Sequence, residues 1–177
     1  GMEYVIAVPH NVIGPRQRYD DPYRNVAAIM INRMLQGKQP VIYGDGEQKR
    51  CFSFVQDCVD PLVRMGTQPG VSGEVFNIGP DEEFVTIREL ATQLARLLDF
   101  PLKPIHVAAR PHEVRYATCS ADKARMLLGY RPGTSLADGL QSMIEWIRGR
   151  GPRPFRYHLP IEIPSPLVPA TWRDQLL

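Results

Sequence analysis

The sequence predicts an α/β protein, because short apolar segments typical of buried strands alternate with amphipathic segments typical of helices. Two segments show this alternation best. Residues 4–8 form a continuous apolar run that stops at Pro9, as in a strand buried on both faces of a parallel sheet. Residues 85–98 repeat apolar side chains at helical spacing. With 177 residues, of which 44% are hydrophobic and 23% charged, the chain can bury one substantial core.

The N-terminal part is predicted to begin with a strand and to continue into a helix. A strand buried on both faces needs neighbours on each side, and we expect these to come from sequence that precedes this segment. Residues 25–37 place apolar side chains, among them Ile29, Met30 and Met34, at helical spacing, and Gly37 follows as a helix stop.

The middle of the chain is predicted to contain three short strands and one helix. Residues 40–44 form a strand that enters a Gly-Asp-Gly turn. Residues 52–66 begin as a strand and continue as a helix, with Asp57 as the N-cap and Pro61 in the first turn, where proline is tolerated. Residues 73–79 form another short buried strand that ends in glycine.

Three helices are predicted in the C-terminal half. The helix over residues 85–98 starts with a capping box between Thr86 and Glu89. A short helix follows Ser120 as its cap and stops at Gly129. The apolar face of the last helix, over residues 135–151, consists of Leu136, Leu140, Met143, Ile144 and Ile147.

Residues 151–177 differ from the rest of the chain. Six prolines alternate there with aromatic and aliphatic side chains. The prolines exclude a long helix, and the apolar content is too high for a free linker. We expect an extended arm that packs on another part of the protein, and a partly ordered terminus is the alternative.

The composition excludes several classes of function. The formal net charge is +2 and no basic block occurs, which argues against nucleic acid as a partner. No apolar run approaches the ~18 residues of a membrane helix. No signal peptide is visible, so a cytoplasmic location is expected. The three cysteines, Cys51, Cys58 and Cys119, and the four scattered histidines fit no zinc pattern, so free thiols and no metal site are expected.

Five polar residues stand where a ligand could bind. Asn11 follows the first strand, where open α/β sheets bind ligands, and Asn25 begins a helix whose N-terminus suits an anion. Arg50 and Arg110 offer planar forks of donors that match phosphate oxygens, and Glu113 could accept from ribose hydroxyls. Each residue alone has an ordinary explanation as an ion-pair partner, a turn residue, a helix cap or a loop residue.

The order of the segments is more specific. "NVIGPR", "YGDGEQKRCFSFVQDCV", "FNIG", "VTIRELA" and "RPHEV" follow one another in a pattern that resembles the C-terminal half of the extended short-chain dehydrogenases, the NAD-dependent epimerase/dehydratase family. The resemblance covers residues 4–148. It implies the C-terminal strands of a Rossmann-like sheet plus a small mixed α/β substrate-binding domain over residues 3–150. Residues 3–15 and 52–80 would contribute to the sheet, and the N-terminal Rossmann half would be absent.

The resemblance also implies roles for individual residues. The nucleotide-sugar phosphates would be contacted by Asn11, Asn25, Arg50 and Arg110. Val41 and Tyr43, on a short strand, would lie along the base, and Glu113 would bind the ribose. Pro9 and His10 would lie beside the nicotinamide of NAD. His112 stands where many relatives have glycine, and the arginine that often precedes the first asparagine is missing, which leaves the sugar open.

The family's chemistry implies a longer parent protein. A Gly-rich turn for NAD and a Tyr-x-x-x-Lys pair, which together form a 4-keto sugar in relatives, do not occur in the 177 residues. We therefore expect no catalytic residue here and no turnover by this chain alone. Its expected partners are a nucleotide sugar, with UDP favoured by its frequency in the family, and further copies of itself bound through the exposed sheet edge. Nucleic acid and membrane are not expected as partners. A standalone binding module and an inactive remnant remain as alternatives, and epimerase, dehydratase and decarboxylase are not separated.

Overall fold

The computed structural model describes residues 1–161 and 165–177, and Ile163 and Pro164 of the Pro-rich arm lie outside the described residues. The strands are β1 (Ile6–Pro9), β2 (Val12–Ile13), β3 (Val41–Tyr43), β4 (Lys49–Arg50), β5 (Ser53–Phe54), β6 (Val75–Ile78), β7 (Val85–Thr86) and β8 (Ile105–Val107). The helices are α1 (Val26–Leu35), α2 (Val55–Thr67), α3 (Ile87–Leu98), α4 (Asp122–Leu128), α5 (Leu136–Arg150) and α6 (Ala170–Arg173). The predicted α/β class is confirmed.

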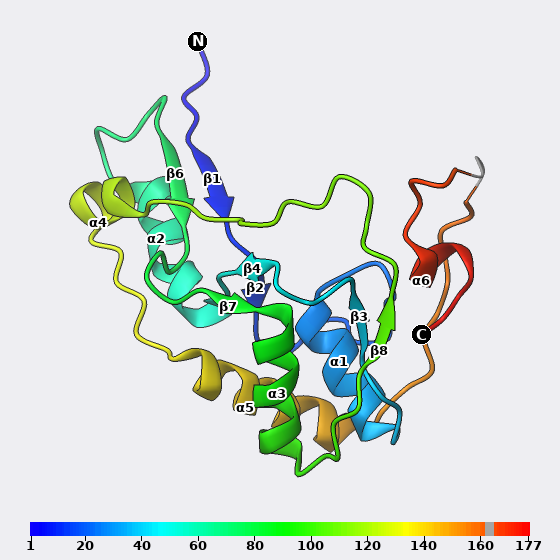
Figure 1. The fold of residues 1–177 in the computed structure, drawn as a ribbon. Coiled ribbons are helices and arrows are strands. Elements are labelled where there is room, and N and C mark those ends of the chain that lie inside the picture. Colours follow the sequence, from blue (N-terminus) through cyan, green and yellow to red (C-terminus); the bar gives the residue numbers. More distant parts are fainter. Residues whose placement is uncertain (162–164) are drawn as a thin grey trace.

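One layer of the molecule is a parallel pair of strands covered by two helices. β1 pairs with β6 in parallel, with Ile6 opposite Val75. Helices α2 and α4 lie on this pair (Figure 1), and the core between them includes Phe76, Leu128 and Tyr130. A parallel pair needs a crossover connection, which α2 provides.

The first strand is not buried on both faces in this chain, in agreement with the expectation that its neighbours are not among these residues. Ile6 is 46% exposed and Val8 is 39% exposed. The physical reason is that β1 has only one partner strand among the described residues, so its outward side chains have no second layer to pack on. The strand nevertheless has the apolar composition of a parallel-sheet interior.

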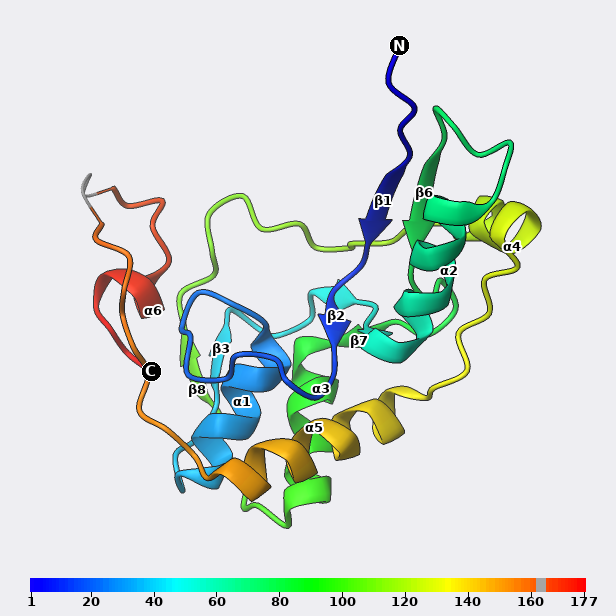
Figure 2. The same cartoon turned by 180° about the vertical axis from the view of Figure 1, so that it is seen from behind.

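The larger core lies among three helices. Helices α1, α3 and α5 pack on one another below the strands (Figure 2), and the predicted apolar face of α5 is confirmed, since all five of its side chains are buried. Burying each such side chain contributes about 1.5–3 kcal/mol relative to leaving it exposed. None of the helices in the described part of the chain is long and apolar enough to cross a bilayer.

Three short strand pairs join the two layers. β2 pairs with β5 in parallel, β3 with β8 in parallel, and β4 with β7 in antiparallel orientation. After β8, the chain crosses back towards α4 in an extended segment, residues 108–121, which both views show running beside β4 (Figures 1 and 2). This segment forms a bridge from Tyr116 to Lys49. The extended segment therefore connects the β3–β8 pair to the layer that contains the β1–β6 pair.

The helix ends confirm some predictions and correct others. The capping box of Thr86 and Glu89 is present, and Gly129 ends α4 with φ 61°. Asp57 is not an N-cap, because α2 already begins at Val55, and Asp57 instead accepts from the backbone and hydroxyl of Thr134.

Two further corrections concern single residues at helix starts. Pro61 lies inside α2 rather than in its first turn, so it cannot donate a hydrogen bond to the carbonyl of Asp57. Ala121, not Ser120, is the N-cap of α4. Ser120 lies one residue before this cap, and its hydroxyl still accepts from the N–H of Asp122.

The Pro-rich arm packs back on the body of the protein. It leaves the end of α5, passes α1 and ends beside β3 and β8, where the short helix α6 lies (Figures 1 and 2). Asn32 of α1 holds it at Arg153, donating to its carbonyl at 2.8 Å and accepting from its N–H at 3.0 Å. Trp172 donates from Nε1 to the carbonyl of Pro22. The arm is thus anchored at both ends.

Candidate functional site

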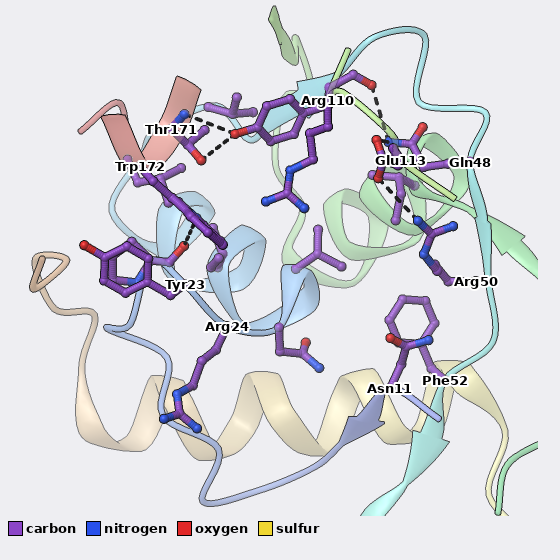
Figure 3. Close-up of a pocket in the computed structure, with 18 residues that line it drawn as sticks. Asn11, Tyr23, Arg24, Gln48, Arg50, Phe52, Arg110, Glu113, Thr171 and Trp172 are labelled. Carbon is purple, nitrogen blue, oxygen red and sulfur yellow. Dashed lines mark hydrogen bonds and ion pairs between the residues drawn. The ribbon is translucent and has the colours of Figure 1, made fainter. Parts of the chain in front are cut away.

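A pocket of about 360 Å³ lies between the N-terminal end of α1, strands β3 and β4, the segment after β8 and the C-terminal arm (Figure 3). The structure brings seven residues that the resemblance singled out to this one cavity. They are Asn11, Asn25, Val41, Tyr43, Arg50, Arg110 and Glu113. Their positions span a hundred residues of sequence, so folding alone places them together.

The polar end of the pocket is built around Arg50 of β4. Its Nη2 lies 3.3 Å from Oε1 of Glu113, and its Nη1 donates to the carbonyl of Lys49 at 2.7 Å. Gln48 donates to the other oxygen of Glu113 at 3.5 Å. Both ion-pair side chains are about one-fifth exposed, and Figure 3 shows the fork of Arg50 next to Phe52. The charge is therefore fixed by a strand and partly shielded from water.

Asn11 and Asn25 use their side chains to hold the backbone. Asn11 donates from Nδ2 to the carbonyl of Cys51 at 2.8 Å, from a backbone position with φ 35°. Asn25 accepts from the N–H groups of Ala27 and Ala28, and donates to the carbonyl of Val12. Asn25 is thus a helix cap, as its ordinary explanation predicts, and what it presents to the pocket is the N-terminal end of α1.

The aromatic end of the pocket is formed by Tyr43 and Trp172. The guanidinium of Arg110 lies 4.7 Å from the ring centroid of Tyr43 and 5.4 Å from that of Trp172. The Nε of Arg110 is buried and has no hydrogen-bond partner among the described residues. Tyr43 and Thr171 share a 2.6 Å hydrogen bond between their hydroxyls. The two rings therefore form a slot that accepts a flat, delocalised group.

The electrostatics of the pocket favour an anion. Its charged side chains are those of Arg24, Arg50 and Arg110 against the single carboxylate of Glu113. Arg24 is 65% exposed and its Nε donates to Asp21 at 2.8 Å. The N-terminal end of α1 adds a partial positive charge. Of the described lining residues, none is a histidine, cysteine or lysine.

Several lining residues were not predicted from the sequence. Trp172, Thr171 and Leu177 come from the arm, and the only sequence signal for them was the apolar content of that segment. Tyr23 precedes α1, and its ring packs edge-on against Trp172 with centroids 5.3 Å apart. Gln48 lies within the predicted "YGDGEQKR" segment, but its role in holding Glu113 depends on a partner 65 residues away.

Pro9 and His10 lie outside the residues that line the pocket. They stand at the end of β1, where the N–H of His10 donates to the carbonyl of Ile78 at 2.9 Å. Ser53 donates from its hydroxyl to the carbonyl of His10 at 2.6 Å. A Cβ on Gly79 would come within 3.0 Å of the His10 side chain, so glycine there lets the chain pass close to the ring.

Comparison with known proteins adds three findings. The model of the NAD dependent epimerase/dehydratase family matches residues 1–79. The chain is 37% identical over 144 residues to the UDP-glucose 4-epimerase of Mycolicibacterium smegmatis. This match covers 80% of this chain and 44% of that protein. It is 32% identical over 154 residues to the UDP-N-acetyl-alpha-D-glucosaminuronate decarboxylase of Bacillus cytotoxicus, with coverages of 84% and 47%.

The fold is also similar to a solved structure. The crystal structure of the UDP-glucose 4-epimerase of Thermotoga maritima with UDP-glucose superposes with a TM-score of 0.76 at 34% sequence identity. The match covers 84% of this chain and 47% of that one. The chain therefore spans about half the length of the relatives it matches.

Proposed function

Because the chain belongs to the NAD-dependent epimerase/dehydratase family, we propose that it is the nucleotide-sugar-binding part of an NAD-dependent sugar epimerase or dehydratase. The ligand is a UDP-sugar, in keeping with the names of the relatives compared above. The longer protein acts through a 4-keto sugar in the cytoplasm. The part described here binds and orients the substrate and turns over no sugar by itself.

The observation that carries this proposal is the division of one pocket into a cationic end and an aromatic end. A nucleoside diphosphate has the same division, with two phosphates joined through a ribose to a flat base. We assign the diphosphate to Arg50, Arg110 and the N-terminal end of α1, where the two forks match its oxygens and the helix dipole favours its charge. We assign the base to Tyr43 and Trp172.

Two of the assigned residues must rearrange to bind this ligand. Arg110 now occupies the aromatic slot, and we propose that the base displaces its guanidinium towards the phosphates. Glu113 is held by Arg50, and the diphosphate competes for that fork and releases the carboxylate to the ribose hydroxyls. Arg110 would exchange the two rings for phosphate oxygens, and Glu113 would exchange the Arg50 fork for ribose hydroxyl donors, so both side chains keep a polar or charged partner.

The residues present do not fit NAD by themselves. Pro9 and His10 lie at the carboxyl end of β1, on the other side of Asn11 from the pocket lining. The sequence contains no Gly-rich βα turn that could hold the NAD pyrophosphate. We therefore place NAD in the longer protein only, with residues 3–150 as its substrate-binding part and residues 151–177 as an arm. No step of its chemistry is assigned to the residues described.

Nuclear magnetic resonance tests the proposed function on the chain as it is. UDP-glucose, dTDP-glucose and glucose 1-phosphate are each added to uniformly 15N-labelled protein. We expect saturable shifts at the amides of Asn25, Tyr43 and Arg50 with both nucleotide sugars, and much weaker ones with glucose 1-phosphate, which has no base. Shifts elsewhere would reject the assigned pocket. No shifts in folded protein would reject the standalone binding module and would mean that the site closes only with the N-terminal half or that the chain is an inactive remnant.

Self-association through β1 stays a prediction. Ile6, Val8 and Val75 are all more than one-third exposed on the β1–β6 pair, and exposed apolar edges favour pairing with another chain. Light scattering at rising protein concentration measures it. We expect a mass above that of one chain, and a monomer at all concentrations would contradict the expectation.

A further inference from the structure

A second cluster of chemically reactive side chains lies just beyond the polar end of the pocket. His10 stands at the end of β1, Cys51 between β4 and β5, and Cys119 in the segment before α4. One ring nitrogen of His10 and the two sulfur atoms all lie within 4.8 Å of one another. None of the three side chains lines the pocket. Since the residues are 41 and 68 positions apart, their sequence spacing predicted no metal site.

Backbone contacts hold the first two residues in place. Asn11, next to His10, donates from its side chain to the carbonyl of Cys51 at 2.8 Å. Ser53 donates from its hydroxyl to the carbonyl of His10 at 2.6 Å, and β2 and β5 pair directly after these residues. The backbone of Gly79 lies close to His10, since a Cβ added at Gly79 would lie 3.0 Å from the Cβ of His10. The imidazole and the Cys51 thiol are therefore positioned by the fold.

The third residue is fixed by two contacts on either side of it. The N–H of Ala117 donates to the carbonyl of Lys49 at 3.3 Å, next to the strand that leads to Cys51. The N–H of Ala121 donates to the carboxylate of Asp81 at 2.9 Å. Cys119 thus faces Cys51 because the extended segment is pinned at both ends.

The donor set points to a particular class of ion. One imidazole and two thiolates suit Zn²⁺ and exclude Mg²⁺ and Ca²⁺, which take oxygen ligands. Zn–S bonds of about 2.3 Å and Zn–N bonds of about 2.0 Å put tetrahedral ligand atoms roughly 3.5–3.8 Å apart, so the observed span needs only a small contraction. Burial raises the pKa of the Cys51 thiol to about 11 and also raises that of Cys119. Both thiols are therefore protonated without a metal, and binding would release protons.

We propose that His10, Cys51 and Cys119 bind one Zn²⁺-type cation, with water in the fourth position. The ion would join the end of β1 to the segment that carries Arg50 and Phe52, and so brace the polar end of the pocket. Its role is positional, because none of the three ligands lines the pocket. The proposal is independent of the pocket's ligand.

Cobalt is the probe that tests this site, because Co²⁺ occupies zinc sites and absorbs light when thiolates bind it. The reduced chain is titrated with CoCl₂ without oxygen and in a phosphine reductant. We expect one equivalent to produce a near-ultraviolet sulfur-to-cobalt band and intense visible bands typical of tetrahedral geometry, and Zn²⁺ to remove both. Cys119→Ser should remove the sulfur band or reduce it by about half, and His10→Ala should weaken Co²⁺ binding at least tenfold.

Cys58→Ser is the matched control, since Cys58 is also buried but belongs to α2 and packs in the core beneath that helix, outside the cluster. It should leave the bands unchanged. Circular dichroism checks that each variant is folded. Folded protein without a sulfur band, or a band that Cys119→Ser leaves intact, would overturn the metal site. A chain that binds no Co²⁺ but forms a Cys51–Cys119 disulfide on mild oxidation would also overturn it.

Discussion

The two ends of the pocket are built in different ways. The polar end stands on β4 and on the segment after β8, within the part of the chain that resembles known relatives, and its charges are held by one ion pair and one amide. The aromatic end joins Tyr43 of β3 to Trp172 of α6, a residue of the arm that lies outside the resemblance. Under the proposed assignment, phosphate binding depends on the part of the chain that resembles known relatives, and base binding depends partly on the arm.

The largest effect is expected from Arg50→Ala. Removing this fork should weaken UDP binding by roughly 1.5–3 kcal/mol, the usual cost of losing a charged hydrogen bond, which is about 10- to 150-fold in affinity. Pyrophosphate should lose a similar factor and uridine almost none. Calorimetry measures all three. Arg88→Ala is the control, because Arg88 is 61% exposed, pairs with Glu47 and does not line the pocket.

Arg110→Ala should weaken UDP binding by about the same amount, roughly 1.5–3 kcal/mol. This residue lies between the two ends, since its guanidinium packs on both rings while its Nε has no partner among the described residues. If the base displaces it towards the phosphates, the variant should lose affinity for pyrophosphate but gain or keep affinity for uridine. Equal binding of UDP by both arginine variants and the parent would show that the phosphate assignment is wrong.

Trp172→Ala should affect the ligands that contain a base, and not pyrophosphate. Losing one stacked ring should weaken UDP and uridine binding by about 1–3 kcal/mol and leave pyrophosphate unchanged. Trp172→Phe should keep most of the affinity. Trp146→Phe is the control, since the only other tryptophan lies beside Tyr19, away from the pocket. Loss of pyrophosphate binding in Trp172→Ala would remove the distinction between the two ends.

A smaller effect is expected from Tyr43→Phe, which keeps the ring and deletes its hydroxyl. That hydroxyl bonds both the side chain and the N–H of Thr171, so its loss should loosen the arm by about 0.5–1.5 kcal/mol per bond. Hydrogen exchange at Thr171 should become faster, while binding of pyrophosphate stays the same. Tyr116→Phe, at an exposed site, is the control. Unchanged exchange would mean that these bonds do not hold the arm.

The smallest effect is expected from Glu113→Gln. The carboxylate competes with an incoming anion for Arg50, and ion pairs that water still reaches contribute only about 0–1 kcal/mol. Removing its charge should therefore tighten pyrophosphate binding slightly, up to about fivefold by that range. UDP should gain less, because it would lose a partner for its ribose. Weaker pyrophosphate binding would show that Glu113 positions Arg50 rather than competing with the ligand.

The sequence predicted most of the helices, because their signals are local. The capping box at Thr86 and the apolar face of α5 depend on residues within one or two turns. Asp57 was misassigned because the same residue type suits an N-cap and a distant contact, and only the fold brings Thr134 to it. The exposure of β1 was predicted, since a strand with the composition of a parallel-sheet interior needs neighbours that the rest of this chain was not expected to supply.

The candidate site was predictable where a residue belongs to a recognisable segment. Arg50 and Glu113 were singled out in this way, and the structure places them 3.3 Å apart. Trp172 was not, because nothing in a Pro-rich arm states which surface the arm will cover. The cluster of His10, Cys51 and Cys119 was also not predictable, since it depends on three segments that meet only in the folded chain.

Calorimetric titration of the purified chain with UDP tests the central claim most directly. The claim is that this pocket, as folded here, binds a nucleoside diphosphate. We expect one UDP per chain, with affinity that falls in both Arg50→Ala and Trp172→Ala, and no binding of NAD. Folded protein that binds no UDP, or that binds it equally well in both variants, would contradict the account.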